Sequence, residues 1–170
     1  MAPTIAVCKF VGTISLGLLT GVSYTLSATA LPSLLGLPTA ANAYTAFLSL
    51  QTSAKRNLRL LTATTITSLS LAFVLSPSRA RHPYLLWASL VAAAGGAVDY
   101  ALRHDEDALI EEATNGGGEK SWVDVEKGED VNGEMVRSAM EKFTRAESVR
   151  AAISGLAFTM GVVGIWGDGA

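Results

Sequence analysis

Acidic residues are absent from the first 98 positions of this 170-residue chain, and all fifteen lie between Asp99 and Asp168. The first 98 positions instead carry long apolar runs, interrupted only by small residues and by six Lys or Arg. Because charged groups are costly to place in hydrocarbon, this distribution separates a part that lies in lipid from a part that lies in water. The chain is therefore predicted to be a small polytopic membrane protein with one acidic loop.

The composition favours the same interpretation, since the chain is 49% hydrophobic and has a mean hydropathy of +0.35. Crossing a hydrocarbon core of about 30 Å takes about 20 helical residues. Four segments are long and apolar enough, and four segments cannot close a barrel. The predicted fold class is therefore all-α, with four transmembrane helices. The predicted spans are residues 10–30, 58–75, 83–102 and 149–166.

These spans divide the chain into a membrane domain (1–102), an acidic loop (103–148) and a fourth span with a short tail (149–170). Residues 114–133 combine three consecutive glycines with five acidic residues and few apolar ones, so we expect them to be disordered. Apolar residues then recur at helical spacing near 134–147. This spacing predicts an amphipathic helix that lies on the membrane surface or leads into the fourth span.

The connections between the spans carry prolines and basic residues. Leu31–Asn42 contains two prolines and predicts a turn, and Ser76–Pro77 ends the second span before a short basic hairpin. Residues 43–57 are predicted to be helical, and Lys55, Arg56 and Arg59 lie at the entry to the second span, where long basic side chains reach the headgroups. With four crossings, both termini and the hairpin share one side of the membrane. The excess of basic residues places the acidic loop on the cytosolic side.

The N-terminal segment imitates a cleaved signal peptide, because Lys9 is followed by an apolar run and by Ala28–Ala30. The apolar stretch continues to Leu37, however, which is longer than a usual signal core, and further apolar segments follow. We therefore expect this segment to remain as the first span. The N-terminus also lacks the arginines and the basic amphipathic face of a mitochondrial presequence.

Glycines recur at spacings that favour helix packing. Gly17 and Gly21 form a GxxxG pair in the first span, and Gly161 and Gly164 form a flat patch in the fourth. Small residues let helix backbones approach closely, which drives association in lipid. We predict that these four glycines mediate packing within the bundle, the alternative being a homodimer interface.

Sequence signs of catalysis and metal binding are missing. Cys8 is the only cysteine, and His82 and His104 have no neighbour at ligand spacing, so neither a metal nor a cofactor is predicted. Asp99 is the one acidic residue within a predicted span, a position that is often functional. Because Arg103 lies four residues further on the same helical face, we interpret Asp99 as half of a structural ion pair.

Trp122 is the one aromatic residue in the acidic centre of the loop, where a large apolar side chain is costly unless a partner receives it. An extended strand there could add to the edge of a sheet while Trp122 and Val125 enter pockets. Asp124 and Glu126 would then face a basic rim. Ser121 is a predicted phosphorylation site that would add charge beside the strand.

This pattern resembles the Atg8-family-interacting motif of selective autophagy receptors, a Trp-x-x-Val sequence flanked by acids. Residues 119–126 are therefore the predicted docking site for an Atg8-like protein or another autophagy factor. The alternatives are a loop aromatic with no partner and one that lies on the membrane surface. The lipid bilayer is the other predicted partner; no nucleic-acid partner is predicted, and the oligomeric state stays open.

Three motifs resemble those of the fungal autophagy-related protein thirty-three family. The first reads RHPYLL, and Gly17–Ser27 and Gly161–Gly169 are similar to the first span and the glycine-rich end of that family. The resemblance implies a non-enzymatic protein of the mitochondrial outer membrane that promotes selective autophagy of mitochondria, with a variable cytosolic loop as its working surface. The RHPYLL residues are Arg81, His82, Pro83, Tyr84, Leu85 and Leu86.

A looser resemblance links the chain to small four-helix membrane enzymes of the anthrone-oxygenase-like group. It rests on a glycine-rich first span that leads into Ser27–Pro32. The later Trp/Asn and His/Arg positions of that group are not found in the fourth span, which weakens the enzyme interpretation. A four-helix membrane enzyme is thus the alternative function. A structural membrane component with no specific partner is a third hypothesis.

Overall fold

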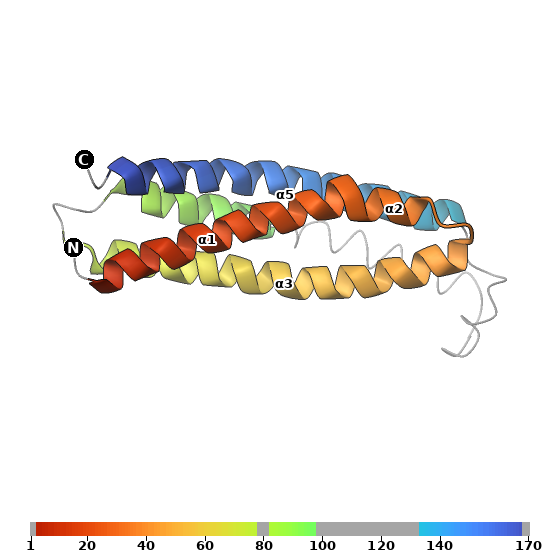
Figure 1. Ribbon diagram of the computed structural model, residues 1–170, viewed down its shortest axis with the longest axis horizontal. Coiled ribbons are helices and arrows are strands. Elements are labelled where there is room, and N and C mark those ends of the chain that lie inside the picture. Colours follow the sequence, from red (N-terminus) through yellow and green to blue (C-terminus); the bar gives the residue numbers. More distant parts are fainter. Residues whose placement is uncertain (1–2, 78–81, 98–132, 168–170) are drawn as a thin grey trace.

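The computed structural model describes residues 3–77, 82–97 and 133–167. Within these ranges every regular element is a helix, so the predicted all-α class is confirmed. Figure 1 shows an elongated bundle of long helices lying side by side, with the N- and C-termini at the same end.

The first continuous helical segment of the bundle combines three consecutive elements. The α-helix α1 (Pro3–Thr25) continues through the π-helix η1 (Leu26–Ala30) into α2 (Leu31–Leu35). Pro32 lies in the first turn of α2, and the N–H of Leu31 donates to the carbonyl of Leu26, five residues back. A wide π-turn accommodates proline because it realigns the backbone around the missing N–H group.

The turn predicted over Leu31–Asn42 is therefore too long. Leu31–Leu35 is helical because proline is tolerated in the first turn of a helix. The chain reverses after Leu35, where the N–H of Gly36 donates to Ser33 and the N–H of Leu37 donates to Leu34. Thr39 then adopts an extended conformation and precedes the next helix.

The longest helix is α3 (Ala40–Leu75), which has 36 residues and a length of about 54 Å. It ends at Leu75, where the sequence predicts an end, because Ser76 is extended and Pro77 cannot continue the helix. Since a bilayer core is about 30 Å thick, α3 is long enough to extend beyond it. The predicted second span, residues 58–75, is only the C-terminal half of this helix.

Two more helices complete the described structure. A shorter apolar helix runs over Pro83–Ala97; it is green and unlabelled in Figure 1. It lies beside α5 (Gly133–Gly167), which has 35 residues. The amphipathic segment predicted near 134–147 is thus continuous with the fourth span, and its apolar face is buried rather than turned toward a membrane surface. The buried residues on that face are Val136, Met140, Phe143 and Ala146.

Three clusters of buried residues hold the bundle together along its length. One lies toward the termini and combines Leu16 of α1, Leu69 of α3 and three residues of the Pro83–Ala97 helix. A middle cluster joins Leu19 and Leu58. The third, at the opposite end, joins Leu31 of α2, Phe47 of α3 and the apolar face of α5.

Three helical stretches of the described residues are long and apolar enough to cross a membrane: Pro3–Leu35, Asn42–Leu75 and Val136–Gly167. Pro83–Ala97 is apolar but shorter. Large apolar side chains on the outside of these helices are exposed, among them Phe10, Leu18 and Val163. An outward apolar surface on helices of this length is what lipid requires, so the chain has three or four apolar helices that could span a membrane.

Candidate functional site

The RHPYLL motif begins the Pro83–Ala97 helix at the end of the bundle that holds the termini. Arg81 lies outside the described residues, and His82 directly precedes the helix. Pro83 occupies the first helical position, where its fixed φ favours helix formation. Leu85 is completely buried in the core cluster with Leu16 and Leu69, whereas Leu86 is exposed.

The ring of Tyr84 is the centre of this motif. The Nζ atom of Lys9 lies 5.8 Å from the ring centre, and the imidazole of His82 lies 6.0 Å away by ring centres. Lys9 is only 4% exposed, although it belongs to the first apolar helix. An ammonium group over an aromatic face is attracted by the ring quadrupole, and the attraction is stronger where water is excluded. The motif therefore provides the surroundings that a buried lysine requires.

Gly164 of α5 is also in contact with the Tyr84 ring. A Cβ atom at position 164 would lie 2.5 Å from Cδ2 of Tyr84, a distance that real Cβ atoms essentially never show. Only glycine thus lets the Tyr84 ring lie this close to the backbone of α5. The RHPYLL motif and the glycine-rich C-terminal motif, 80 residues apart in sequence, are in direct contact.

The other predicted packing glycines differ from one another. A Cβ at Gly17 would lie 3.0 Å from the ring of Phe158, and one at Gly161 would lie 3.4 Å from Oγ1 of Thr13, so both lie between α1 and α5. Gly21 is exposed, and a Cβ there would meet nothing within 4 Å. Among the described residues, Gly21 therefore brings no second helix close.

A charged pair is buried farther along α5. The Nη1 atom of Arg150 lies 2.5 Å from Oε1 of Glu147, and the two side chains are 3% and 1% exposed. Arg150 also donates from Nε to the carbonyl of Gly95 in the Pro83–Ala97 helix, at 3.4 Å. The pair therefore links the last two helices. Buried charges of this kind are retained only when paired and hydrogen-bonded.

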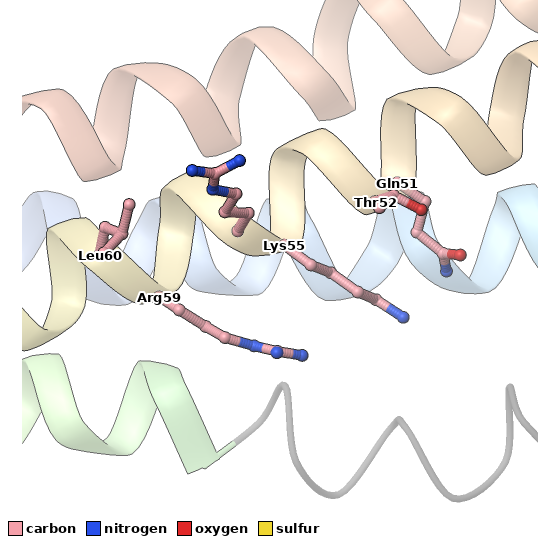
Figure 2. A pocket seen from close by; sticks show the side chains of 6 residues that line it. Gln51, Thr52, Lys55, Arg59 and Leu60 are labelled. Carbon is pink, nitrogen blue, oxygen red and sulfur yellow. The ribbon is translucent and has the colours of Figure 1, made fainter.

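Basic side chains gather on α3 at a similar level of the bundle. Lys55, Arg56 and Arg59 line an open hollow of about 580 Å³ together with Gln51, Thr52 and Leu60. Figure 2 shows that Lys55 and Arg59 extend in the same direction from the helix. Among the residues that the structure describes, no group of three or more His, Cys, Asp or Glu side chains is placed to hold a metal ion.

The predicted docking residues lie outside the described part of the chain. Trp122, Val125, Asp124, Glu126 and the predicted phosphorylation site Ser121 all fall within residues 98–132. The predicted pair Asp99–Arg103 and the segment expected to be disordered, 114–133, fall there almost entirely as well. These interpretations stay predictions.

The roles of Lys9 and of the Glu147–Arg150 pair were not predicted from the sequence. Glu147 lies four residues after Phe143 and seven after Met140, so it shares the apolar face of α5. An acid on an apolar face, followed at i+3 by an arginine, is the signal that predicts a buried pair. Lys9 gave a weaker signal, because a lysine near the start of an apolar segment is usually a flanking residue.

Comparisons with known proteins place these motifs in context. The chain matches the family model described as "Autophagy-related protein 33" over residues 1–122, which include the RHPYLL motif. It is 38% identical over 184 residues to Autophagy-related protein 33 of Gibberella zeae, and this alignment covers 98% of the chain and 93% of the relative. No solved structure matches the chain.

Proposed function

Because the chain belongs to the autophagy-related protein 33 family, we propose that it is a four-span, non-enzymatic protein of the mitochondrial outer membrane that promotes selective autophagy of mitochondria. The observation that carries the proposal is the family match over nearly the whole chain, joined by the contact between Tyr84 and Gly164. That contact gives the family's most recognisable motif a physical role: it fixes the end of the bundle at which the chain turns.

The distribution of charge supports four crossings. Pro83–Ala97 is about 22 Å long, so the third crossing is assigned to residues 83–102, of which the structure describes the first fifteen. Each assigned helix has a charge-free stretch long enough to cross a hydrocarbon slab, and a basic residue bounds at least one end of each stretch. The charge-free stretches are residues 10–54, 60–78, 82–98 and 151–167.

The acidic loop is the proposed working surface. Both termini lie at one end of the bundle, so with four crossings residues 98–132 connect helices on the opposite side. Basic counts favour the cytosol for that side. There the Trp122–Val125 segment would dock onto a sheet edge of an Atg8-like protein, flanked by Asp124 and Glu126.

Deleting the gene and following the turnover of a mitochondrial matrix reporter under starvation tests the cellular role. We expect reporter turnover to fall and to return when the wild-type chain is re-expressed. Turnover that is unchanged by the deletion would overturn the proposed function.

The docking hypothesis is tested separately in the full-length chain. Trp122→Ala with Val125→Ala should abolish capture by an Atg8-like protein. Trp166→Ala is the control, because it also removes a tryptophan side chain but on the opposite side of the membrane, and it should leave capture unchanged. Capture that survives the loop substitutions would remove the docking hypothesis and leave the cellular role standing.

The location in the outer membrane and the side on which the loop lies are tested by protease protection on intact mitochondria. A tag within Gly116–Gly118 should be digested from outside, and a tag after Ala170 should be protected until the outer membrane is opened. The two tags act as each other's control. Digestion of both, or of neither, would contradict the proposed four-span topology.

A further inference from the structure

The basic hollow on α3 lies directly beyond the last described turn of the Pro83–Ala97 helix. A Cβ at Gly96 would lie 3.5 Å from Thr62, so that turn contacts α3. Arg59, which lines the hollow, precedes Thr62 by three residues, or about 4.5 Å along α3 and away from the termini. Figure 2 shows Lys55 and Arg59 extending from the side of α3 on which this helix, drawn in green, lies. The hollow is therefore where further turns of the same helix would lie.

The buried face of the Pro83–Ala97 helix has a regular spacing that continues in the sequence beyond it. The buried residues follow one another at intervals of three, four and three, and intervals of this kind keep residues on one face of a helix. They are Leu85, Ala88, Ala92 and Gly95. The same spacing next reaches Asp99, Leu102, Glu106 and Leu109. If the helix continued, two acids and two leucines would face the bundle.

The contact between Gly96 and Thr62 sets the register of such a continuation. The Pro83–Ala97 helix runs antiparallel to α3, because the chain reverses between them at the end that holds the termini (Figure 1). Asp99 is three residues after Gly96, and Arg59 is three residues before Thr62. Asp99 would therefore lie at the level of Arg59.

The second acid on this face falls on the hollow as well. Glu106 is ten residues after Gly96, which corresponds to Thr52 on α3. Thr52 lines the hollow, and Arg56 lies one helical turn away from it. Both acids that would face the bundle thus lie opposite the basic part of α3.

Charge and connectivity favour this segment of the chain as the occupant of the hollow. Residues 98–132 contain eleven acidic and three basic residues, a net charge of −8. At a similar level of the bundle, Glu147 and Arg150 of α5 pair with each other, so Arg59 adds a positive charge that this pair does not balance. The segment is also joined covalently to a helix beside the hollow. A second copy of the chain or a free anion would have to compete with that high effective concentration.

We propose that residues 98–112 continue the Pro83–Ala97 helix along α3 and dock in the basic hollow, with Asp99 paired to Arg59. Arg59 then replaces Arg103 as the partner of Asp99. Residue 112 would lie sixteen residues, or about 24 Å, beyond Gly96. The remaining loop would thus leave from the end of the bundle opposite the termini. This docking does not depend on the proposed role in autophagy.

Hydrogen exchange of the full-length protein in neutral detergent, followed by mass spectrometry, tests the proposal. We expect the amides of residues 99–112 to exchange about ten-fold or more slowly than those of residues 119–130, because docked helical amides are protected. Arg59→Glu should remove this difference, since it places a like charge opposite Asp99. Arg59→Glu with Asp99→Arg restores opposite charges and should recover most of the slow exchange.

Two control variants separate this pair from general charge effects. Arg145→Glu makes the same charge change at an exposed position of α5 and should leave the exchange of residues 99–112 unchanged. Arg59→Glu with Asp124→Arg has the same net charge as the restoring variant, but it changes an acid outside the docked segment and should not recover slow exchange. Circular dichroism checks that each variant is folded, which we expect because Arg59 and Arg145 are exposed.

Four results would overturn the proposal. Equally fast exchange of residues 99–112 and 119–130 in the wild type would show that the segment does not dock. Slow exchange that survives Arg59→Glu would show that the hollow does not hold the segment. Recovery with Asp124→Arg as complete as with Asp99→Arg would remove the specific pair. Protection that is lost when the protein is diluted would assign the hollow to a second copy of the chain.

Discussion

Gly12 of α1 lies directly against Leu69 of α3: a Cβ atom at position 12 would stand 2.6 Å from Cδ2 and 2.7 Å from Cγ of Leu69. Leu69 is 1% exposed within the core, so its side chain has little space into which it can move. Gly21, nine residues further along α1, is exposed and has nothing within 4 Å of its Cβ position. Two glycines of one helix thus have opposite surroundings.

Gly12→Val should therefore destabilise the bundle, whereas Gly21→Val should not. We expect a loss of about 1–3 kcal/mol for Gly12→Val, because added methyl groups overpack a filled core. Gly21→Val should change stability by less than about 0.5 kcal/mol, as at other exposed sites. Thermal unfolding of the purified protein in detergent, followed by circular dichroism, measures both. Similar losses for the two variants would contradict the contact.

The contact between Tyr84 and Gly164 predicts energetic coupling between two distant segments. Gly164→Ala should displace the Tyr84 ring and lower the unfolding temperature. In a protein that already carries Tyr84→Ala, Gly164→Ala should lower it much less, because no ring remains to be displaced. A double-mutant cycle should give a coupling of about 0.5–3 kcal/mol. Gly167→Ala is the control, because a Cβ at that position meets nothing within 4 Å. Additive effects of the two substitutions would mean that the ring and the glycine do not touch.

The long helices were predictable because hydrocarbon imposes a simple pattern on the sequence. Apolar runs without charge identify the spans, and Pro77 ends α3 at the expected residue. The flanking segments were also predicted to be helical, but their continuity with the spans was not predictable in the same way. Residues 40–57 and 133–148 carry polar and charged side chains, and they extend α3 and α5 because their apolar faces bury each other.

The site was predictable only in part, for a related reason. Sequence similarity identifies Tyr84 and Gly164 separately, but their contact depends on the relative rotation of two helices, which no local pattern specifies. Lys9 is a similar case. Its position suits a headgroup neighbour, and only the packed bundle places the ammonium group over the Tyr84 ring.

The buried Glu147–Arg150 pair predicts an asymmetric response to substitution. Arg150→Leu removes the cation that pairs with the buried Glu147 carboxylate and should cost about 3–5 kcal/mol. Replacing both residues with leucine should be much less destabilising, because no lone charge remains. Denaturation in mixed micelles, followed by circular dichroism, measures the difference.

The exposed pair Arg137–Glu141 on the same helix is the matched control. Its side chains are 73% and 45% exposed, and Arg137→Leu should change stability by less than about 1 kcal/mol. If Arg150→Leu proved as mild as Arg137→Leu, the Glu147–Arg150 pair would have to be accessible to water.

The ring contact between Phe47 and Phe143 predicts how the end of the bundle opposite the termini responds to protease. The two rings meet edge to face, with centroids 5.8 Å apart, and both residues are buried. Phe47→Ala should therefore loosen α5 even though the substitution lies on α3, at a cost of about 3–5 kcal/mol. Trypsin should then cleave after Arg137 and Lys142 faster than in the wild type. Phe10→Ala, at a position that is 65% exposed, should leave the cleavage rate unchanged. If residues 133–147 lay on the membrane surface instead, Phe47→Ala would not alter cleavage of α5.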